Sequence, residues 1–215
     1  SINALARKIT KWTVLEDCKL HRLMQYLNCT LHYREVAWVG DAIDKLELHL
    51  FADADLASDP EDHVSTSGVH LEISGPDTKF PLRDQSKKQT AVSHSTPEAE
   101  IVAIDHALRT VGLPALQLWD VLLQRPTKLH LHEDNAACIR VMETGRNPTM
   151  RHLGRTHRID VAWTAERIQG PDVELIKTDA KIMAADIHTK PFPYGLRSDW
   201  ERDLRLINIV DPNKF

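Results

Sequence analysis

The chain has 215 residues, 42% of them apolar, with 27 basic and 31 acidic side chains and a formal net charge of −4. This length suits one medium domain with an appendage, or two small domains, and the apolar content can form a buried core. The sequence has no run of 18 apolar residues and no signal-peptide core near its start, so we expect no membrane association. The acidic balance argues weakly against a nucleic-acid coat protein but allows a nuclease, whose active site is itself acidic.

The N-terminal segment predicts an amphipathic helix over residues 13–31, because its apolar residues recur at helical spacing. We expect this helix to pack against a neighbouring part of the protein. Residues 39–45 are typical of a connector, and we place a domain boundary near residue 43. The three cysteines are scattered and form no Cys-x-x-Cys pair, which favours a reducing compartment without disulfides or a zinc cluster.

From residue 46 the apolar period changes to two, which predicts β-strands. We expect strands at 46–53, 68–74 and 79–84, with turns at 58–62 and 75–78. Short turns between consecutive strands indicate an antiparallel meander. Pro81 favours an edge position for the third strand.

Helices and single strands alternate after the meander. Ser95 or Thr96 can cap a helix that has Pro97 at its first position and continues to about Val111. Further helices are predicted at 113–124, 135–144, 158–169 and 181–190, and strands at 128–134 and 172–178. Strands that are separated by helices pair in parallel, so the sequence predicts a mixed sheet.

Two of these strands share the pattern Leu-His-Leu-x-x-Asp, in LHLFAD (48–53) and LHLHED (129–134). By strand alternation, Asp53 and Asp134 leave the sheet on the face opposite the leucines. If the two strands are parallel neighbours, both carboxylates lie at the carboxyl end of the sheet, where open α/β sheets bind ligands. Alternatively, each acid only begins a turn or caps a helix.

The helix predicted at 96–111 carries a third acid, Glu100, on the same stripe as Ala103, Ile104 and Ala107. A carboxylate on a core-facing stripe is costly unless it has a partner such as a metal ion. Glu98 points to another face and is typical of a first-turn acid. Asp186, in MAADIHTK, is a fourth acid embedded among small and apolar residues, and its simplest interpretation is a helix N-terminal acid.

Four converging carboxylates would repel one another, which raises their pKa values unless cations neutralise them. Ligation by oxygen alone selects Mg²⁺ or Mn²⁺ over zinc. Two such ions, about 4 Å apart, can hold the attacking and leaving oxygens of a phosphodiester. The spacing of the acids therefore favours a site for two Mg²⁺ ions, for which Mn²⁺ can substitute.

The motifs FADADLAS, STSGVHLEI, SKKQTAVSHSTPEAEIVAI, LHEDNAACI and AADIHTKPF occur in one order over residues 46–192. In order and spacing they resemble the ribonuclease H domain of Ty1/copia-type retrotransposon Pol polyproteins. The family's catalytic and metal-binding acids fall on Asp53, Glu100, Asp134 and Asp186, with Asp55 as an auxiliary acid. Leu56, Pro97 and the HRID stretch depart from the family pattern, which affects substrate contacts rather than the acids.

The resemblance implies a ribonuclease-H-like fold, with a five-stranded mixed sheet whose first three strands are antiparallel and last two parallel, flanked by helices. It implies three segments: a helical connection from the reverse-transcriptase side (1–43), a ribonuclease H domain (44–193) and a C-terminal tail (194–215). It also implies hydrolysis of the RNA strand of an RNA:DNA hybrid, leaving a 5′-phosphate and a 3′-hydroxyl. The implied partners are the hybrid and the reverse-transcriptase domain of the same polyprotein. The implied location is intracellular, in cytoplasmic virus-like particles, with a nuclear phase left open.

Basic residues concentrate in RVMETGRNPTMRHLGRTHR (140–158), which reverses the acidic balance of the chain and indicates phosphate contacts. Small polar side chains near the acids could read the 2′-hydroxyl groups of RNA. The candidate nucleic-acid ligands are Ser67, Lys87, Lys88, Gln89, Ser95, Asn135, Arg151, Arg155 and Arg158. His152 and His157 are candidates for assisting proton transfer or product release, although a structural or phosphate-contact role is the simpler interpretation.

Two other functions fit the sequence less well. One is a catalytically silent tether or connection domain that binds hybrid, and the four intact acids disfavour it. The other is a nuclease of the same superfold that cuts DNA, and the STPEAE and ADIHTK motifs disfavour it.

Overall fold

The computed structural model describes residues 2–57 and 62–214. Residues 1–36 with 209–215, and residues 37–208, form two compact units. Apart from Asp62, the turn predicted at 58–62 lies outside the described residues. No helix in the described ranges is both long and apolar enough to cross a membrane.

The smaller unit contains the helix predicted at 13–31, observed as α2 (Val14–Cys29). Thr13 caps this helix by accepting a hydrogen bond from the Leu15 backbone N–H. Val14, Leu15 and Met24 of its apolar face are exposed, so the packing partner predicted for this helix stays a prediction. The other elements of the unit are α1 (Ile2–Ala6), η1 (Ile9–Lys11), η8 (Pro212–Lys214) and the antiparallel pair β1 (Arg34–Glu35) and β8 (Ile209–Val210).

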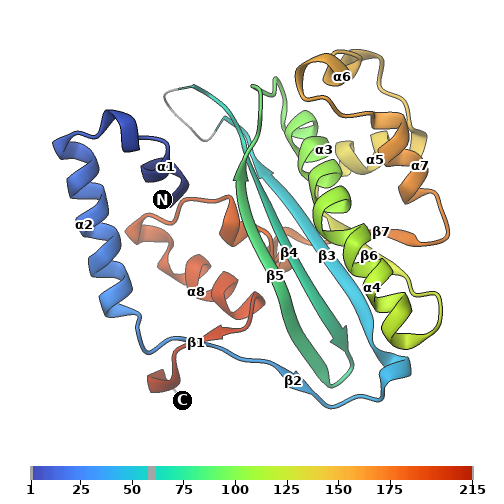
Figure 1. The fold of residues 1–215 in the computed structure, drawn as a ribbon, viewed down its shortest axis with the longest axis horizontal. Helices are drawn as coiled ribbons and strands as arrows, with labels where there is room; N and C mark the ends of the chain where they lie inside the picture. The colour runs from blue at the N-terminus through green and yellow to red at the C-terminus, as the bar shows by residue number, and fades with distance from the viewer. Residues whose placement is uncertain (1, 58–61, 215) are drawn as a thin grey trace. The chain divides into compact units, whose positions relative to one another are not determined.

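The larger unit is built on a six-stranded sheet with the order β2-β5-β4-β3-β6-β7 (Figure 1). Its strands are β2 (Trp38–Val39), β3 (Glu47–Asp55), β4 (Thr66–Gly75), β5 (Thr78–Lys88), β6 (Leu129–Glu133) and β7 (Val173–Lys177). Strands β3, β4 and β5 are antiparallel neighbours, whereas β6 and β7 continue parallel to β3. The predicted α/β class with a mixed sheet is therefore confirmed.

The short strand β2 is an addition to the five predicted strands, and it pairs with β5 only at Thr78 and Lys79. Pro81 of β5 lies beyond this pairing, next to a register shift between Leu71 and Glu72 on β4. Because β2 is the outermost strand, β5 with Pro81 is the second strand of the sheet and not its edge strand. Pro81 is tolerated because no β2 residue pairs with it and the ladder is already irregular there.

The helical layer is nearly continuous after the meander. Its helices are α3 (Thr96–Ala107), the π-helix η3 (Leu108–Gly112), α4 (Leu113–Leu123), α5 (Ala136–Thr144), η4 (Pro148–Met150), α6 (Leu153–Thr156) and α7 (Val161–Ile168). Gly112 allows the close approach of η3 to the sheet, since a Cβ there would lie 2.7 Å from Leu129 Cδ2 and 2.8 Å from Leu50 Cδ2. Leu48, Leu50, Leu129 and Leu131 form the sheet side of the core beneath Ile101, Ile104 and Leu108.

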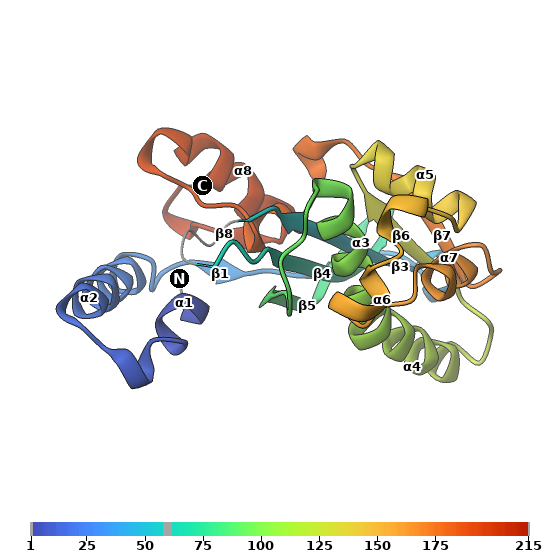
Figure 2. The same cartoon turned by 90° about the horizontal axis from the view of Figure 1, so that it is seen from above.

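The segment after β7 differs from the prediction. Residues 181–190, expected to form one short helix, instead form parts of two 3₁₀ turns, η5 (Ala180–Ile182) and η6 (Asp186–His188). Two further elements follow, η7 (Tyr194–Leu196) and α8 (Arg197–Leu206), while η2 (Ile43–Lys45) precedes β3. Figure 2 shows α8 on the opposite side of the sheet from α4. The predicted segment limits at residues 43 and 193 stay predictions.

Candidate metal centre and nucleic-acid interface

Asp53 and Asp134 are brought together by the register of β3 and β6. The parallel pairing aligns Leu48 with Leu129 and Leu50 with Leu131, so the two Leu-His-Leu sequences lie side by side. Asp53 and Asp134 each follow the first leucine of their pattern by five residues and therefore reach the same end of the sheet. The helix α5 is capped by the Asn135 side chain rather than by Asp134, which leaves the Asp134 carboxylate available for another role.

Glu100 comes from the first turns of α3, which begins where the Ser95 side chain accepts a hydrogen bond from the Glu98 backbone N–H. The Glu100 side chain is 3% exposed, as the stripe pattern predicted. Burial raises the pKa of Glu100 strongly, and repulsion from Glu133, Asp53 and Asp134 raises it further. Among the described residues, Glu100 Oε2 has no hydrogen-bond partner. Glu100 is therefore a buried acid whose hydrogen bond from the Ala54 backbone offsets only part of the cost of its charge.

Asp53, Glu100 and Asp134 form one group, because one carboxylate oxygen of each lies within 4.8 Å of the others. Asp186, on η6, is not part of that group, but it is close enough to feel its charge. Burial raises the pKa of Asp186 to about 7, and repulsion from Asp53 and Asp134 contributes. The Lys190 ammonium forms an ion pair with Asp186 and opposes this rise. We call these four residues the acidic centre.

Glu133 is an additional acid that the sequence argument did not identify. It ends β6 on the same side as Leu129 and Leu131 and is fully buried. Its Oε1 accepts a hydrogen bond from the Asn135 backbone N–H. Burial raises its pKa, and Asp134 and Asp53 contribute. The signal was present in the sequence, because alternation from Leu129 and Leu131 places residue 133 on the core face.

Two residues next to Asp186 also contact the acidic centre. The Thr189 hydroxyl donates a hydrogen bond to Asp53 Oδ2, and its oxygen lies 3.1 Å from the Asp186 carbonyl. Burial raises the pKa of Asp53, whereas this hydrogen bond and the Lys190 charge lower it.

Thr189 and Lys190 belong to the AADIHTKPF motif, but sequence reasoning gave them no role. Asp55, the predicted auxiliary acid, is half-buried two residues beyond Asp53, and burial raises its pKa.

The two candidate histidines lie at Glu98. His152 Nε2 is 3.1 Å from Glu98 Oε1, and His157 Nε2 is 3.7 Å from the same oxygen. Glu98 lies in the first turn of α3, as predicted, but it is only 2% exposed. It is a buried carboxylate that ties the start of α3 to α6. Burial lowers the pKa of His157, which favours its neutral form.

Several predicted nucleic-acid ligands have internal roles. Gln89 Nε2 donates hydrogen bonds to Ser67 Oγ, at 3.0 Å, and to the Ala99 carbonyl, at 2.8 Å. Ser67 and Gln89 are both buried, so we withdraw them from the interface, because a side chain with satisfied internal hydrogen bonds gains little by reaching for RNA. Ser95 and Asn135 are helix caps and are half-buried. They remain candidates through their partly exposed surfaces.

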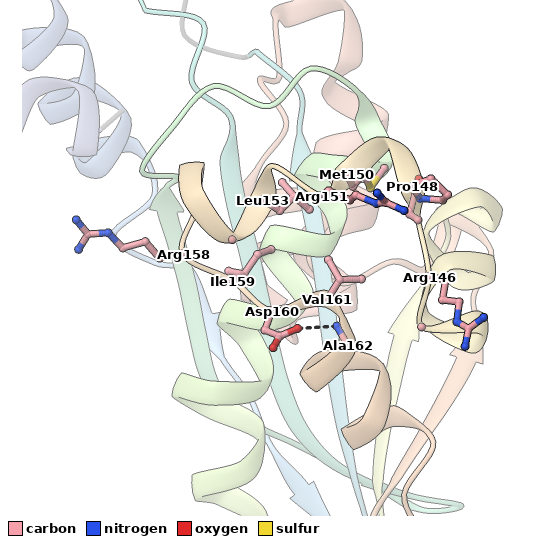
Figure 3. Close-up of a pocket in the computed structure, with 13 residues that line it drawn as sticks. Arg146, Pro148, Met150, Arg151, Leu153, Arg158, Ile159, Asp160, Val161 and Ala162 are labelled. Carbon is pink, nitrogen blue, oxygen red and sulfur yellow. Dashed lines mark hydrogen bonds between the residues drawn. The ribbon is translucent and has the colours of Figure 1, made fainter.

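The basic candidates are on the surface. Lys87, Arg151, Arg155 and Arg158 are exposed, while Lys88 is half-buried and paired with Asp62. Arg146, Arg151 and Arg158 line a cavity of about 610 Å³ that is formed by the segment 145–162. Its apolar lining includes Met150, Leu153, Ile159 and Val161, and Figure 3 shows Arg158 and Arg146 extending away from it at opposite ends.

Asp160 determines how this cavity can bind an anion. Its side chain accepts hydrogen bonds from the Ala162 and Trp163 backbone N–H groups and so caps α7. Figure 3 shows the bond from Ala162. The helix terminus is therefore occupied by the protein's own carboxylate. Phosphate contacts at this cavity would depend on the arginines instead.

The acidic centre fits divalent cations that prefer oxygen. Glu100 Oε2, Glu133 Oε2 and Asp186 Oδ1 are buried carboxylate oxygens without a hydrogen-bond partner in the described part of the chain. Such oxygens are costly unless a cation or proton neutralises them. Carboxylate ligation without nitrogen or sulfur favours Mg²⁺ or Mn²⁺. The donor set therefore supports the predicted metal type.

The sheet order and the acidic centre define an α/β protein with a mixed sheet and a carboxylate centre at one end of that sheet. No family model matches the chain. It is 23% identical over 190 residues to the retrovirus-related Pol polyprotein from transposon RE2 of Arabidopsis thaliana, covering 88% of this chain and 12% of the polyprotein. It is 26% identical over 174 residues to the corresponding polyprotein from transposon RE1, covering 80% of this chain and 11% of that polyprotein.

The predicted similarity to Ty1/copia-type Pol polyproteins is thereby confirmed. The chain matches only a small part of each relative, 12% and 11% of their lengths. Among solved structures, ribonuclease H1 from Halobacterium salinarum NRC-1 aligns with 65% of this chain and 90% of its own, at 13% identity and a TM-score of 0.45.

Proposed function

We propose that this chain is a divalent-metal-dependent endonuclease that hydrolyses the RNA strand of RNA:DNA hybrids during retrotransposon reverse transcription. The observation that carries the proposal is the convergence of Asp53, Glu100 and Asp134, whose carboxylate oxygens lie within 4.8 Å of one another at the end of the sheet. The similarity to retrotransposon Pol polyproteins supports it.

Asp53, Glu100 and Asp134 would hold one Mg²⁺ ion, and Asp53 together with Asp186 would hold a second. When bound, these ions supply an activated water and neutralise charge on the phosphodiester. The carboxylates are positioned by regular secondary structure elements of the larger unit. These are the paired strands β3 and β6 for Asp53 and Asp134, and the buried stripe of α3 for Glu100.

Lys190 and Thr189 would fix the positions of the Asp186 and Asp53 side chains. The Lys190 ammonium neutralises Asp186, and the Thr189 hydroxyl orients Asp53. The exposed arginines Arg151, Arg155 and Arg158 would contact phosphates of the substrate, which predicts binding that weakens as salt concentration rises. His152 and His157 would act through Glu98 by holding the loop that carries these arginines against α3.

The decisive experiment incubates the full chain with labelled RNA:DNA hybrid, duplex DNA and duplex RNA, in Mg²⁺ or in EDTA. We expect cleavage of the RNA strand of the hybrid only, and only with Mg²⁺. Hybrid binding without cleavage would instead indicate the tether function. Cleavage of duplex DNA would indicate a DNA nuclease.

A matched pair of variants tests the acidic centre. Asp134→Asn keeps the size of the side chain but removes its charge, so we expect the fold to persist and cleavage to fall at least about a hundredfold. Asp172→Asn, at an exposed acid before β7, is the control and should retain full activity. Full activity in Asp134→Asn would contradict the proposed role of the centre.

A further inference from the structure

A second cluster of metal-ligating side chains lies outside the acidic centre. It contains His70 on β4, Asp84 on β5 and His188 on η6. One ligand atom of each lies within 4.8 Å of the others. Asp84 Oδ1 is 2.6 Å from His70 Nδ1 and 2.9 Å from His188 Nε2. Two imidazole nitrogens and one carboxylate oxygen therefore converge on one point.

The ligand types differ from those of the acidic centre, and this difference selects the metal. Imidazole nitrogen with carboxylate oxygen suits Zn²⁺, whereas carboxylates alone suit Mg²⁺. We propose that His70, Asp84 and His188 form a zinc site that links β4, β5 and η6. This proposal does not depend on the nuclease function proposed above.

The surroundings of His70 match those of a metal-ligating histidine. Its Nε2 lies 3.1 Å from Glu72 Oε2, so that nitrogen can donate its proton to the carboxylate while Nδ1 faces the metal position. Glu72 is in turn 3.7 Å from Lys79 Nζ. Carboxylates that accept the second N–H of a ligating histidine fix its tautomer and orientation. His70 is completely buried, so its ring is held by packing as well.

The three elements are already fixed relative to one another. His70 and Asp84 are directly paired neighbours on β4 and β5. The Ser86 hydroxyl on β5 donates a hydrogen bond of 2.7 Å to the His188 carbonyl, which attaches η6 to the sheet. The fold therefore already holds the ligand side chains close to one another, so that ion binding would cost little conformational entropy.

The site can also be entered from solvent. The Asp84 side chain is 33% exposed and the His188 side chain 14% exposed, while His70 closes the inner side. Tetrahedral zinc separates its ligand atoms by about 3.3 Å, so Asp84 Oδ1 would move by roughly half an ångström from its present contacts. Three protein ligands leave one position open for water, since zinc prefers four.

The test measures zinc binding to the full 215-residue chain by equilibrium dialysis, with excess Mg²⁺ present. The parent carries Asp134→Asn to weaken the acidic centre, and Cys18→Ser with Cys29→Ser to remove the two exposed thiols. We expect one zinc equivalent in this parent. His188→Gln and Asp84→Asn should each weaken binding at least tenfold, whereas His21→Ala, at an exposed histidine on α2, should leave it unchanged.

Cobalt provides an independent reading of the geometry. Co²⁺ added to the parent should give the intense visible absorption of a tetrahedral site, and His188→Gln should abolish it. Circular dichroism checks that each variant is folded. If a variant does not fold, the imidazole proton resonances of His70 and His188 in the parent decide the question, because zinc must shift both. Unshifted resonances, or unchanged zinc affinity in a folded His188→Gln variant, would overturn the proposal and leave the cluster as an ion-pair network.

Discussion

The Thr189 hydroxyl donates a hydrogen bond to Asp53, a residue 136 positions earlier in the chain. Both side chains are buried, so this contact joins the η6 segment to β3 inside the protein. It is the direct link between Asp53 and the segment that carries Asp186. The position of the fourth acid therefore depends on how η6 packs against the sheet.

Replacing Thr189 tests this link. Thr189→Val keeps the shape of the side chain but leaves the buried Asp53 oxygen without its donor, which should lower the free energy of unfolding by about 1–3 kcal/mol. The loss should also raise the pKa of Asp53, because the hydrogen bond favours its charged form. Thermal unfolding and Mg²⁺ titration of cleavage measure the two effects. Thr189→Ser retains the hydroxyl and should behave like the parent, so equal losses in both variants would contradict the explanation.

Gly68 on β4 controls how closely η6 approaches the sheet. A Cβ at this position would lie 2.7 Å from the Ala185 carbonyl oxygen and 2.7 Å from Thr189 Cγ2. Gly68→Ala should therefore displace η6, lower the free energy of unfolding by about 1–3 kcal/mol and raise the Mg²⁺ concentration needed for cleavage. Gly195→Ala is the control, because no atom of the residues that the structure describes lies within 4 Å of a Cβ there. Similar behaviour of the two variants would show that the close approach has no consequence.

Glu100 should destabilise the metal-free protein. Its pKa is raised in the folded state, so the folded protein binds the extra proton and loses stability as pH rises above the unfolded value near 4.5. Glu100→Gln removes the titrating carboxyl group and with it this loss of stability. In EDTA at pH 8 we expect the free energy of unfolding to increase by about 1 kcal/mol or more. Each kcal/mol should raise the melting temperature by about 2–4 °C. The gain should shrink at pH 5, and Mg²⁺ should no longer raise the melting temperature as it does in the parent.

The control for this experiment is Glu143→Gln, at an exposed acid on α5. It should change the melting temperature little at either pH. A lower melting temperature of Glu100→Gln in EDTA at pH 8 would mean that the charged carboxylate is compensated by the protein itself.

The affinity for Mg²⁺ should increase with pH. The pKa of Asp186 is raised from 3.8 to about 7 by burial and by Asp53, and Glu100 is shifted in the same direction. Mg²⁺ binds the deprotonated carboxylates, so a protonated carboxyl group must release its proton when the metal binds. For each such group, the Mg²⁺ affinity should rise by up to about tenfold per pH unit while the pH is below the raised pKa. Calorimetric titrations at pH 6, 7 and 8 measure this slope. Asp186→Asn should flatten it, and a slope that stays equal in this variant would exclude Asp186 as a source of the proton.

The sequence was informative where a local pattern determines a position. Alternation in LHLFAD and LHLHED identified β3 and β6, and the parallel pairing of Leu48 with Leu129 places Asp53 and Asp134 at one end of the sheet. The apolar stripe of α3 predicted that Glu100 is buried. These inferences succeeded because strand and helix periods fix which face a side chain occupies.

The sequence was less informative where partners come from distant segments. No short sequence pattern indicated that the side chains of Gln89 and Ser67 form a buried hydrogen bond with each other. Nor did a pattern indicate that the buried Glu98 carboxylate contacts His152. The pairing of His70 and Asp84 with His188 likewise depends on β4, β5 and η6 meeting in space.

The sequence alone indicated the α/β class with its mixed sheet and singled out Asp53, Glu100 and Asp134, because strand and helix repeats of two and 3.6 residues fix the face on which a side chain lies. Only the tertiary structure decided the sixth strand, the burial of Glu133 beside those acids and the attachment of η6 through Thr189 and Lys190. The physical reason is that hydrogen bonds and ion pairs between remote residues depend on packing, which no short stretch of the chain specifies.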